Sequence, residues 1–399
     1  MKRAIETTMI PKLTWRSFLR DVLICSLGAY GGPEAHFGVF LDQMVVKRKY
    51  LTEQDLVELL ALCSILPGPT STQTMVSIGY KMSGPVLAFL TMLVWSLPVL
   101  VVMTVLSFLY QFLNLREISL DVLRFIGPMA VGFIILAVYR IGRKVVIDRL
   151  TAVLLVFAAV LTYFIRAPWM FPVVLVAGGI VSIAASGQRD IWHRVAMNPP
   201  WRYLAVFVIL AFGGIAASLF LQSRLVQISE MFYRFGYLVF GGGQVVVPVM
   251  HAELVEVRGY LTTPEFLTGY GLVQGLPGPM FSFAAYAGGM AARGHGAVYQ
   301  VVGAVASGIG IFLPGLLLIY FVYPVWEALK QIPAIRIALK GVGAVAGGLI
   351  AVAAVILAQA SGFTLLNTAV SIATILLLAS RKIPAPLIVL AALILGFIL

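Results

Sequence analysis

The sequence predicts an all-α membrane protein, a polytopic helical bundle built from two inverted repeats with discontinuous helices. Hydrophobic residues make up 61% of the 399-residue chain and charged residues only 11%, whereas soluble globular proteins contain about 45–50% apolar residues. The apolar runs at 86–112 and 337–360 show no two-residue alternation, so they favour helices over a β-barrel. The third observation is an internal repeat, in which residues 31–79 return at 241–289 with a constant offset of 210 residues.

The repeat is recognised by residues that interrupt or end helices. In each copy the first proline of a Pro-Gly-Pro motif follows the tyrosine of a Tyr-Leu-Thr triplet by 17 residues. A shared apolar composition arises easily in membrane proteins, but this shared spacing does not. The matched positions are Gly31-Gly32 with Gly241-Gly242, Arg48 with Arg258, Tyr50-Leu51-Thr52 with Tyr260-Leu261-Thr262, Leu66-Pro67-Gly68-Pro69 with Leu276-Pro277-Gly278-Pro279, and Gly79 with Gly289.

The apolar segments predict three parts, an N-terminal repeat at 1–190, a linker with a connecting helix at 191–222, and a C-terminal repeat at 223–399. Counting each long apolar stretch as one crossing gives 13 crossings and places the two copies in opposite orientation, as in many secondary transporters. This count puts Lys47 and Lys49 outside, against the positive-inside rule. The conflict disappears if the segment around Pro33 folds back as a hairpin.

The net charge of +12 reflects basic residues scattered in short connectors, as the positive-inside rule expects for cytoplasmic loops, and does not indicate a nucleic-acid partner. The basic N-terminal segment 1–21 has no cleavable signal pattern, so we expect a multi-pass protein of the cell inner membrane with a cytoplasmic N-terminus. Cys25 and Cys63 lie in apolar stretches without metal-ligand spacing. We therefore expect no metal and no cofactor.

The Pro-Gly-Pro motifs are the strongest candidates for a binding site. Within an apolar helix such a motif removes backbone donors and clashes with the preceding turn, so the helix must stop and restart. With Pro69 at the first position of the restarted helix, the N–H groups of the next residues are free to bind an anion. In the second copy Pro279 takes that place. The alternative is that both breaks only shape helix packing.

The double-glycine motifs form a second pair of predicted breaks. Glycine permits close backbone approach, so these motifs can expose further N–H groups to the same cavity. Glu34 corresponds to Gln244 across the repeat, and an intramembrane carboxylate is either a functional group or a helix cap. The residues predicted to bind substrate are Gly31, Gly32, Glu34, Gly68, Pro69, Thr70, Ser71, Thr72, Gln73, Gly242, Gly243, Gln244, Gly278, Pro279 and Ser282.

Arg48 and Arg258 occupy matched positions beside the breaks. A matched guanidinium could attract anions, but a connector arginine that anchors a helix end at the headgroups is an equally good interpretation. His36 has no counterpart, because position 246 is Val, and is interpreted as a cavity residue rather than a proton relay.

These motifs resemble those of the chromate ion transporter family, in particular its long members with duplicated halves. The resemblance rests on four blocks, at 31–36, 66–73, 240–248 and 274–279, and covers nearly the whole chain. It implies an inner-membrane carrier that exports chromate from the cytoplasm and confers chromate resistance, with sulfate as a chemically similar competitor. Gly243 stands where the first copy has Pro33, so the two break geometries need not match.

Other functions remain to be weighed against this expectation. An importer or exchanger of sulfate or another oxyanion has the same fold, and a passive anion channel is also compatible with it. An enzyme is not expected, because Glu34 and His36 are two residues apart and would point to different faces of a helix. Besides chromate, the expected partners are membrane lipid and, as the default for such carriers, a second copy of the chain.

Overall fold

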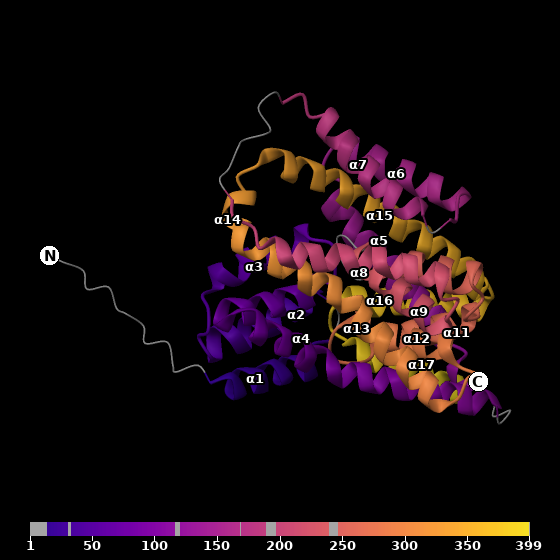
Figure 1. Cartoon of the computed structure of the whole chain (residues 1–399). Coiled ribbons are helices and arrows are strands. Elements are labelled where there is room, and N and C mark those ends of the chain that lie inside the picture. The colour runs from indigo at the N-terminus through magenta and orange to yellow at the C-terminus, as the bar shows by residue number, and fades with distance from the viewer. Residues whose placement is uncertain are drawn as a thin grey trace.

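A computed structural model describes residues 14–30, 33–115, 120–167, 169–188, 197–238 and 246–398, and throughout these ranges the regular structure is helical (Figure 1). The prediction of an all-α membrane protein is thus confirmed. Five helical segments are long and apolar enough to cross a bilayer, at 70–112, 121–145, 201–220, 297–329 and 333–361. The predicted breaks at 31–32 and 241–245, including Gly31, Gly32, Gly242, Gly243 and Gln244, lie outside the described residues.

The first half contains α1 (Trp15–Gly28), α2 (Pro33–Phe40), a π-helix η1 (Leu41–Lys47), α3 (Glu53–Ile65), α4 (Thr70–Leu115), a short 3₁₀ turn η2 (Leu120–Leu123), α5 (Ile126–Val145), α6 (Arg149–Phe164) and α7 (Met170–Ala184). After the connecting helix α8 (Trp201–Phe220), the second half contains α9 (Arg224–Tyr237), α10 (Val246–His251), a π-helix η4 (Ala252–Val257), α11 (Thr263–Gln274), η5 (Met280–Ser282), α12 (Phe283–Ala292), α13 (Ala297–Val322), η6 (Tyr323–Val325), α14 (Trp326–Leu329), α15 (Pro333–Ser361), α16 (Leu365–Ser380) and α17 (Ala385–Ile398). The element order of the first half therefore recurs in the second.

The first apolar stretch folds back on itself. Asp21, in the middle of α1, accepts hydrogen bonds from Gln43 Nε2 at 2.9 Å and from Tyr50 Oη at 2.7 Å. The end of η1 therefore lies beside α1, and Lys47 returns to the end of the molecule at which α1 begins. The chain after Pro33 thus folds back as the hairpin that is needed to reconcile Lys47 with the positive-inside rule.

The second apolar stretch also folds back, in contrast to the single interrupted crossing counted from the sequence. Lys81 Nζ pairs with Asp55 Oδ1 at 2.5 Å, so the first part of α4 runs back along α3. At Ser83 and Gly84 the backbone leaves helical geometry and turns again. Trp95 Nε1 then donates to Thr72 Oγ1 at 3.1 Å, although these residues would be roughly 34 Å apart in a straight helix. The label α4 thus covers two antiparallel helices.

The second half repeats both hairpins. A Cβ at Gly288 in α12 would lie 1.8 Å from Ser307 Oγ in α13, which requires the two helices to run side by side. Glu265, at the start of α11, pairs with Arg293, which directly follows α12. In both copies, stretches counted as crossings return to the end at which they start.

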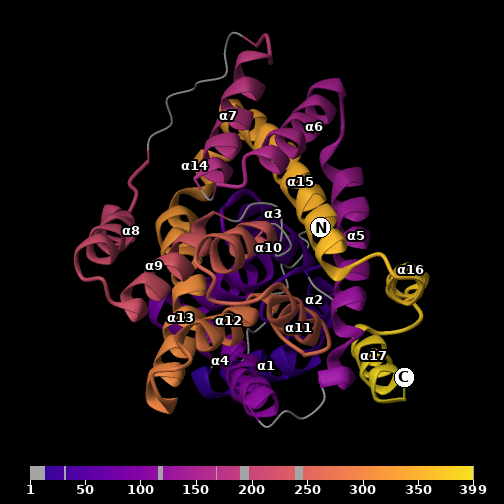
Figure 2. The ribbon, with the colours of Figure 1, turned by 90° about the vertical axis from the view of Figure 1, so that its right-hand side faces the viewer.

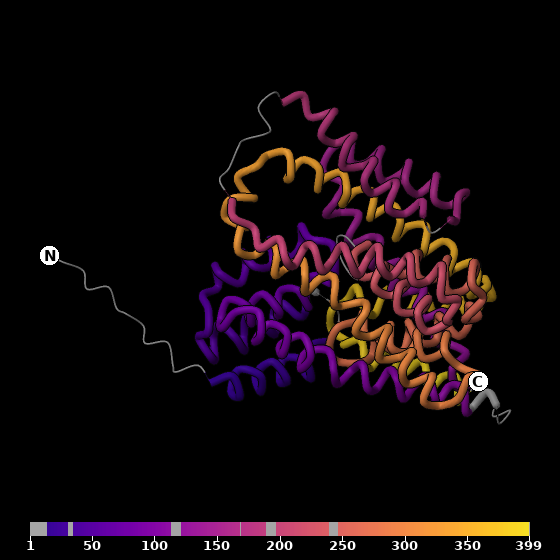
Figure 3. Tube along the Cα trace, in the orientation of Figure 1, coloured from indigo at the N-terminus to yellow at the C-terminus, as the bar shows by residue number. Residues whose placement is uncertain are grey.

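The two sets of hairpins gather at opposite ends of the molecule, α2 and α3 at one end and α11 and α12 at the other (Figure 1). Each set is tied to the opposite half of the chain. Lys330, after α14, pairs with Glu58 of α3 at 2.6 Å, whereas Arg166, after α6, pairs with Glu256 of η4 at 3.5 Å. The tube in Figure 3 shows the early and late parts of the chain meeting in the middle of the bundle.

The helices outside this centre form the periphery. Helices α5, α6 and α7 pack along α15, and α16 and α17 pack on α5 (Figure 2). The connecting helix α8 lies at the opposite edge, against α9 and α13, and most of its large apolar side chains are exposed. This exposed apolar surface and the five long apolar helices are those of a multi-pass membrane protein.

Candidate functional site

The first Pro-Gly-Pro motif interrupts the chain as predicted. Helix α3 ends at Ile65 and α4 begins at Thr70, so Pro69 directly precedes the helix rather than starting it. Gly68 has a φ of +128°, a conformation that L-residues avoid. The first three residues of α4 have no intrahelical acceptor for their N–H groups. Thr70, Ser71, Thr72 and Gln73 are all buried.

Gln73 stabilises this break. Its backbone N–H donates to the Pro69 carbonyl at 2.9 Å, and its Nε2 donates to the Pro67 carbonyl at 2.8 Å. The second bond fixes the orientation of the amide group, because a carbonyl accepts only from the NH₂ side. The Gln73 Oε1 atom therefore points away from Pro67 and is buried without a hydrogen-bond partner.

The second motif makes a related but different break. Helix α11 ends at Gln274, and the chain re-enters helical geometry through the 3₁₀ turn Met280–Ser282 before α12 begins. Gly278 has a φ of +101°. Like the matched Gly68, it adopts a positive φ that residues with a side chain avoid. Ser282 N–H donates to the Pro279 carbonyl at 2.9 Å. The 3₁₀ turn of the second copy therefore uses the Ser282 N–H, whereas the N–H of the matched Thr72 in the first copy stays free.

The two breaks meet at the same part of the bundle. A Cβ at Gly278 would lie 3.1 Å from Val99 Cγ1, and Val99 is one helical turn, about 6 Å, beyond Trp95, which binds Thr72 of the first break. Helix α13 contacts both breaks. Phe281 of the second break packs against Phe312 of α13, with ring centroids 6.4 Å apart, and a Cβ at Gly315 of α13 would lie 3.2 Å from Gln73 Nε2 of the first break. Both breaks therefore pack against the same turns of α4 and α13.

The end of α1 completes the junction. Gly278 N–H donates to the Ala29 carbonyl at 2.8 Å, which joins the second break directly to the first hairpin. Ser26 Oγ donates to the Trp95 carbonyl at 2.7 Å. We call this region, where η5 also contacts α4, the central junction; it comprises Ser26, Ala29, His36, Thr72, Gln73, Trp95, Gly278 and Ser282.

The central junction holds unsatisfied polar atoms. Among the described residues, six buried side-chain nitrogen or oxygen atoms have no hydrogen-bond partner, and three of them are His36 Nδ1, Gln73 Oε1 and Ser282 Oγ. Buried polar groups are nearly always paired, and each exception requires an explanation. The Ser282 hydroxyl and the free N–H groups at the start of α4 are donors suited to a small oxyanion, whereas Gln73 Oε1 only accepts hydrogen bonds and His36 Nδ1 donates only when it carries a proton.

The remaining predicted residues lie elsewhere or outside the described part. Arg48 Nε pairs with Asp21 at 2.8 Å, and Arg258 Nε lies 3.8 Å from Glu253. Both arginines lie at the outer ends of the hairpins and not at the central junction. The side chain of Glu34 is outside the described residues, as are the double-glycine motifs.

Sequence reasoning missed several polar residues. Asp21 is fully buried, and Trp95 and Ser26 take part in the central junction, but neither repeat spacing nor a motif points to them. His36 was set aside because it lacks a counterpart in the second copy. A carboxylate in the middle of a predicted membrane helix was the one available signal for Asp21.

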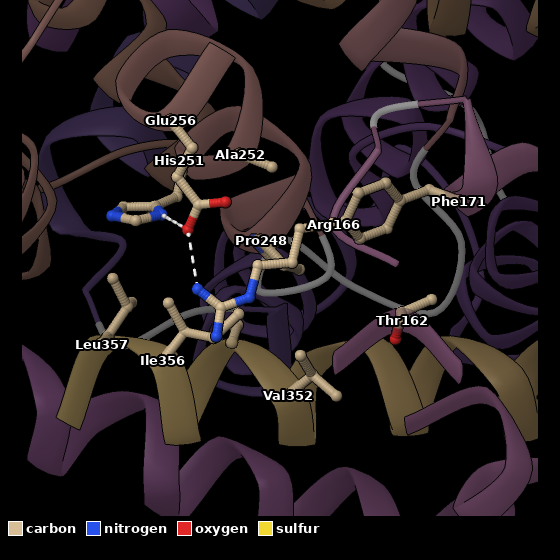
Figure 4. Close-up of a pocket in the computed structure, with 11 residues that line it drawn as sticks. Thr162, Arg166, Phe171, Pro248, His251, Ala252, Glu256, Val352, Ile356 and Leu357 are labelled. Carbon is tan, nitrogen blue, oxygen red and sulfur yellow. Dashed lines mark ion pairs between the residues drawn. The ribbon is translucent and has the colours of Figure 1, made fainter. Parts of the chain in front are cut away.

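A second polar site lies at the far end of the bundle (Figure 4). The Glu256 carboxylate is 3.5 Å from both His251 Nδ1 and an Arg166 Nη1 atom, between α6, η4 and α15. The His251 ring holds the pKa of the Glu256 carboxyl below its ordinary value, partial burial opposes this shift, and Arg166 reinforces it. Among the described residues, no group of three potential His, Cys, Asp or Glu ligands could hold a metal ion.

Comparison with known proteins identifies relatives along most of the chain. The chromate transport protein of Pseudomonas aeruginosa is 26% identical over 374 residues, which cover 88% of this chain and 82% of the relative. The chromate transport protein of Cupriavidus metallidurans is 26% identical over 393 residues, covering 97% and 94%. An uncharacterized transporter of Methanocaldococcus jannaschii is 24% identical over 311 residues, covering 76% and 74%. No solved structure matches the chain.

The family profile described as chromate transporter matches the chain twice, at residues 16–183 and 226–397. The two matches contain both sets of hairpins and the helices that follow them. Together with the relatives, this places the chain in a family of transporters rather than of enzymes. The protein belongs to the chromate transporter family.

Proposed function

We propose that the protein is a secondary transporter that exports chromate from the cytoplasm by alternating access and so confers chromate resistance. The observation that carries the proposal is the central junction, where two interrupted helices from different halves meet around unpartnered buried polar atoms. Chromate is a small dianion with four oxygens, which suits helix N-termini and hydroxyl donors. The names of the curated relatives support chromate as the substrate.

The arrangement in the membrane follows from the hairpins. If all four hairpins enter the bilayer and return, the second part of α4 and the helices α5, α6, α7 and α8 cross between the first copy and the second. Five crossings are an odd number, so the two copies would open towards opposite faces, the inverted-repeat design of many carriers. The basic connectors around Lys47 and Arg202 then face the cytoplasm of an inner-membrane protein, in agreement with the positive-inside rule.

Export of a dianion agrees with the energetics of an inside-negative membrane. Moving one charge through 100 mV is worth about 2.3 kcal/mol, so two negative charges leaving an inside-negative cell gain about 4.6 kcal/mol. No ATP-binding motif of the form GxxxxGK[ST] occurs in the sequence. The membrane potential can therefore drive export by itself.

The test is chromate transport by the purified full-length protein in proteoliposomes with an imposed potential. Ser282→Ala removes a buried, unpartnered hydroxyl and should raise the half-saturating chromate concentration about tenfold, the loss of one hydrogen bond to a charged ligand. The matched control is Ser380→Ala, because Ser380 is exposed and its hydroxyl donates to the Leu377 carbonyl and accepts from the Lys382 N–H at the end of α16, away from the central junction. Equal behaviour of the two variants would contradict the proposed site.

Substrate and direction are tested in the same vesicles. Sulfate is added in increasing amounts on the chromate side, and competition is expected because sulfate has the same charge and shape. Transport should accelerate when the receiving side is positive and slow when the potential is reversed. Potential-independent, non-saturating flux would instead indicate a passive channel.

A further inference from the structure

His36 lies inside the central junction without an obvious structural role. Its side chain is only 2% exposed, and its Nδ1 atom has no hydrogen-bond partner. A buried imidazole nitrogen without a partner costs free energy that folding alone does not recover. Position 36 is therefore a candidate for a group that acquires its partner when the protein binds something.

The surroundings of His36 connect both helix breaks. Its ring packs edge-on against Trp95, with centroids 5.5 Å apart, and Trp95 Nε1 donates to Thr72 of the first break. The Ala29 carbonyl, at the end of α1, accepts from Gly278 N–H of the second break at 2.8 Å. In the neutral tautomer that carries its proton on Nε2, the unpartnered Nδ1 has a lone pair that can take up a proton.

The charged groups on the elements packed against α2 are already matched or exposed. Glu34, on α2 itself, has a side chain outside the described residues. On α1 the thiol of Cys25 is buried, and Arg16 and Arg20 are exposed. The other charged groups are paired: Asp21 of α1 with Arg48, Asp42 of η1 with Lys47, and Lys81 of α4 with Asp55. Among the side chains that the structure describes on these elements, the imidazole is therefore the group at the central junction whose charge can change.

We propose that His36 takes up one proton at Nδ1 from the buffered solvent, leaving the buffer in its basic form, when an oxyanion dianion binds at the central junction, so that the carrier binds anion and proton together. The step adds H⁺ to the imidazole lone pair and forms an imidazolium, which attracts the dianion and gives it a further N–H donor. The inference rests on the proposed function, since it assigns a proton to the same site. It reverses the interpretation of His36 drawn from the repeat.

The test is proton uptake during chromate binding, measured by titration calorimetry of the full-length protein in two buffers with different ionisation enthalpies. Wild type should take up about one more proton per bound chromate than His36→Gln, as linkage requires for a group that becomes protonated on binding. The protonation of chromate itself is the same for both proteins and cancels in the difference. The matched control is His295→Gln, because His295 is exposed in the turn between α12 and α13 and should leave proton uptake unchanged.

The possible outcomes separate the inference from the function beneath it. Chromate binding with equal proton uptake in wild type and His36→Gln would overturn the role of His36 and leave the transporter intact. Absence of chromate binding by the folded wild type would overturn the proposed function and this inference with it. If His36→Gln does not fold, His36→Asn replaces it. Proton uptake by the wild type alone is also measured, at a pH where free chromate is fully a dianion. Zero net uptake there would overturn the inference, and an uptake of about one proton would support it.

Discussion

In both copies the first hairpin contains a buried carboxylate that pairs with the arginine at a matched position, Arg48 or Arg258, but the carboxylate lies on a different helix. In the first copy, the fully buried Asp21 on α1 accepts hydrogen bonds from Gln43 and Tyr50 and forms an ion pair with Arg48. In the second copy, Met231 occupies the position matched to Asp21, and Glu253 occupies the position matched to Gln43. The carboxylate has therefore moved from the straight helix to the π-helix.

The second copy also contains more buried charge. Arg234 on α9 makes hydrogen bonds of 2.7–3.2 Å to both Glu230 and Glu253, and all three side chains are less than 20% exposed. In the first copy the cation is Arg48, whose side chain is 40% exposed. The comparison teaches that the π-helix keeps the hairpin geometry while the charges that hold it change. The first hairpin of the second copy should therefore depend on its ion pairs more strongly than the first hairpin of the first copy.

The largest effect is expected from Arg234→Gln. The variant leaves Glu230 and Glu253 buried without their shared cation, and loss of one partner from a buried ion pair costs about 3–5 kcal/mol. Thermal unfolding of the purified protein in detergent measures the loss. The control is Arg258→Gln, since Arg258 is 38% exposed and 3.8 Å from the same Glu253, and should cost less than about 1 kcal/mol. Equal destabilisation by both variants would contradict the comparison.

A smaller effect is expected from Asp21→Asn in the first copy. The neutral side chain loses charge-assisted hydrogen bonds from Tyr50 and Arg48, at a cost of about 2–3 kcal/mol. Arg48 can turn towards water because it is partly exposed, so no charge remains buried. The same thermal unfolding experiment ranks the two copies. A greater loss for Asp21→Asn than for Arg234→Gln would show that the first hairpin is the more dependent on charge.

The comparison also explains how much could be predicted from sequence. Long apolar runs predicted helices, and the Pro-Gly-Pro motifs located both breaks to within one residue, because proline restricts the backbone through local sterics. The antiparallel course of α3 and the start of α4 could not be predicted in this way. A broken helix continues or returns according to tertiary contacts such as Asp55 with Lys81, whose residues are far apart in the sequence.

The candidate site shows the same division. Motifs pointed to Thr72, Gln73 and Ser282, which carry or neighbour unpartnered polar atoms in the structure. They did not point to Ala29, whose backbone carbonyl joins the two copies, because a backbone contact leaves no trace in residue type. His36 was missed for a different reason. A comparison of matched positions identifies only residues that both copies share, and His36 is matched by Val246.

The second hairpins allow a sharper version of the comparison. Arg293 donates two hydrogen bonds to Glu265, and these side chains are 30% and 7% exposed. In the first copy Asp55, which matches Glu265, pairs with Lys81, and these side chains are 30% and 33% exposed. We expect Arg293→Gln to cost about 1–2 kcal/mol and Lys81→Gln about 0.5 kcal/mol or less, by thermal unfolding. Indistinguishable melting temperatures for the two variants would limit the difference between the copies to their first hairpins.

The smallest effect concerns the contacts that tie each hairpin set to the opposite half. Glu256 of the second copy meets Arg166 and His251, and the pKa of its carboxyl is lowered in the folded protein. A carboxyl with a lowered pKa adds stability above the pKa it has in the unfolded chain, and this stability is lost as the pH falls through the lower, folded-state pKa. Glu256→Gln should therefore destabilise the protein by less than about 1 kcal/mol at neutral pH and converge with wild type in acid.

The control for Glu256→Gln is Glu327→Gln, because Glu327 pairs with Lys330 at the other end of the molecule and is 75% exposed. Melting temperatures of both variants and the wild type, measured from neutral to acidic pH, check the expectation. Only Glu256→Gln should show a difference from wild type that shrinks as the pH falls. A difference that stays constant with pH would mean that Glu256 stabilises the far end by packing and not by its charge.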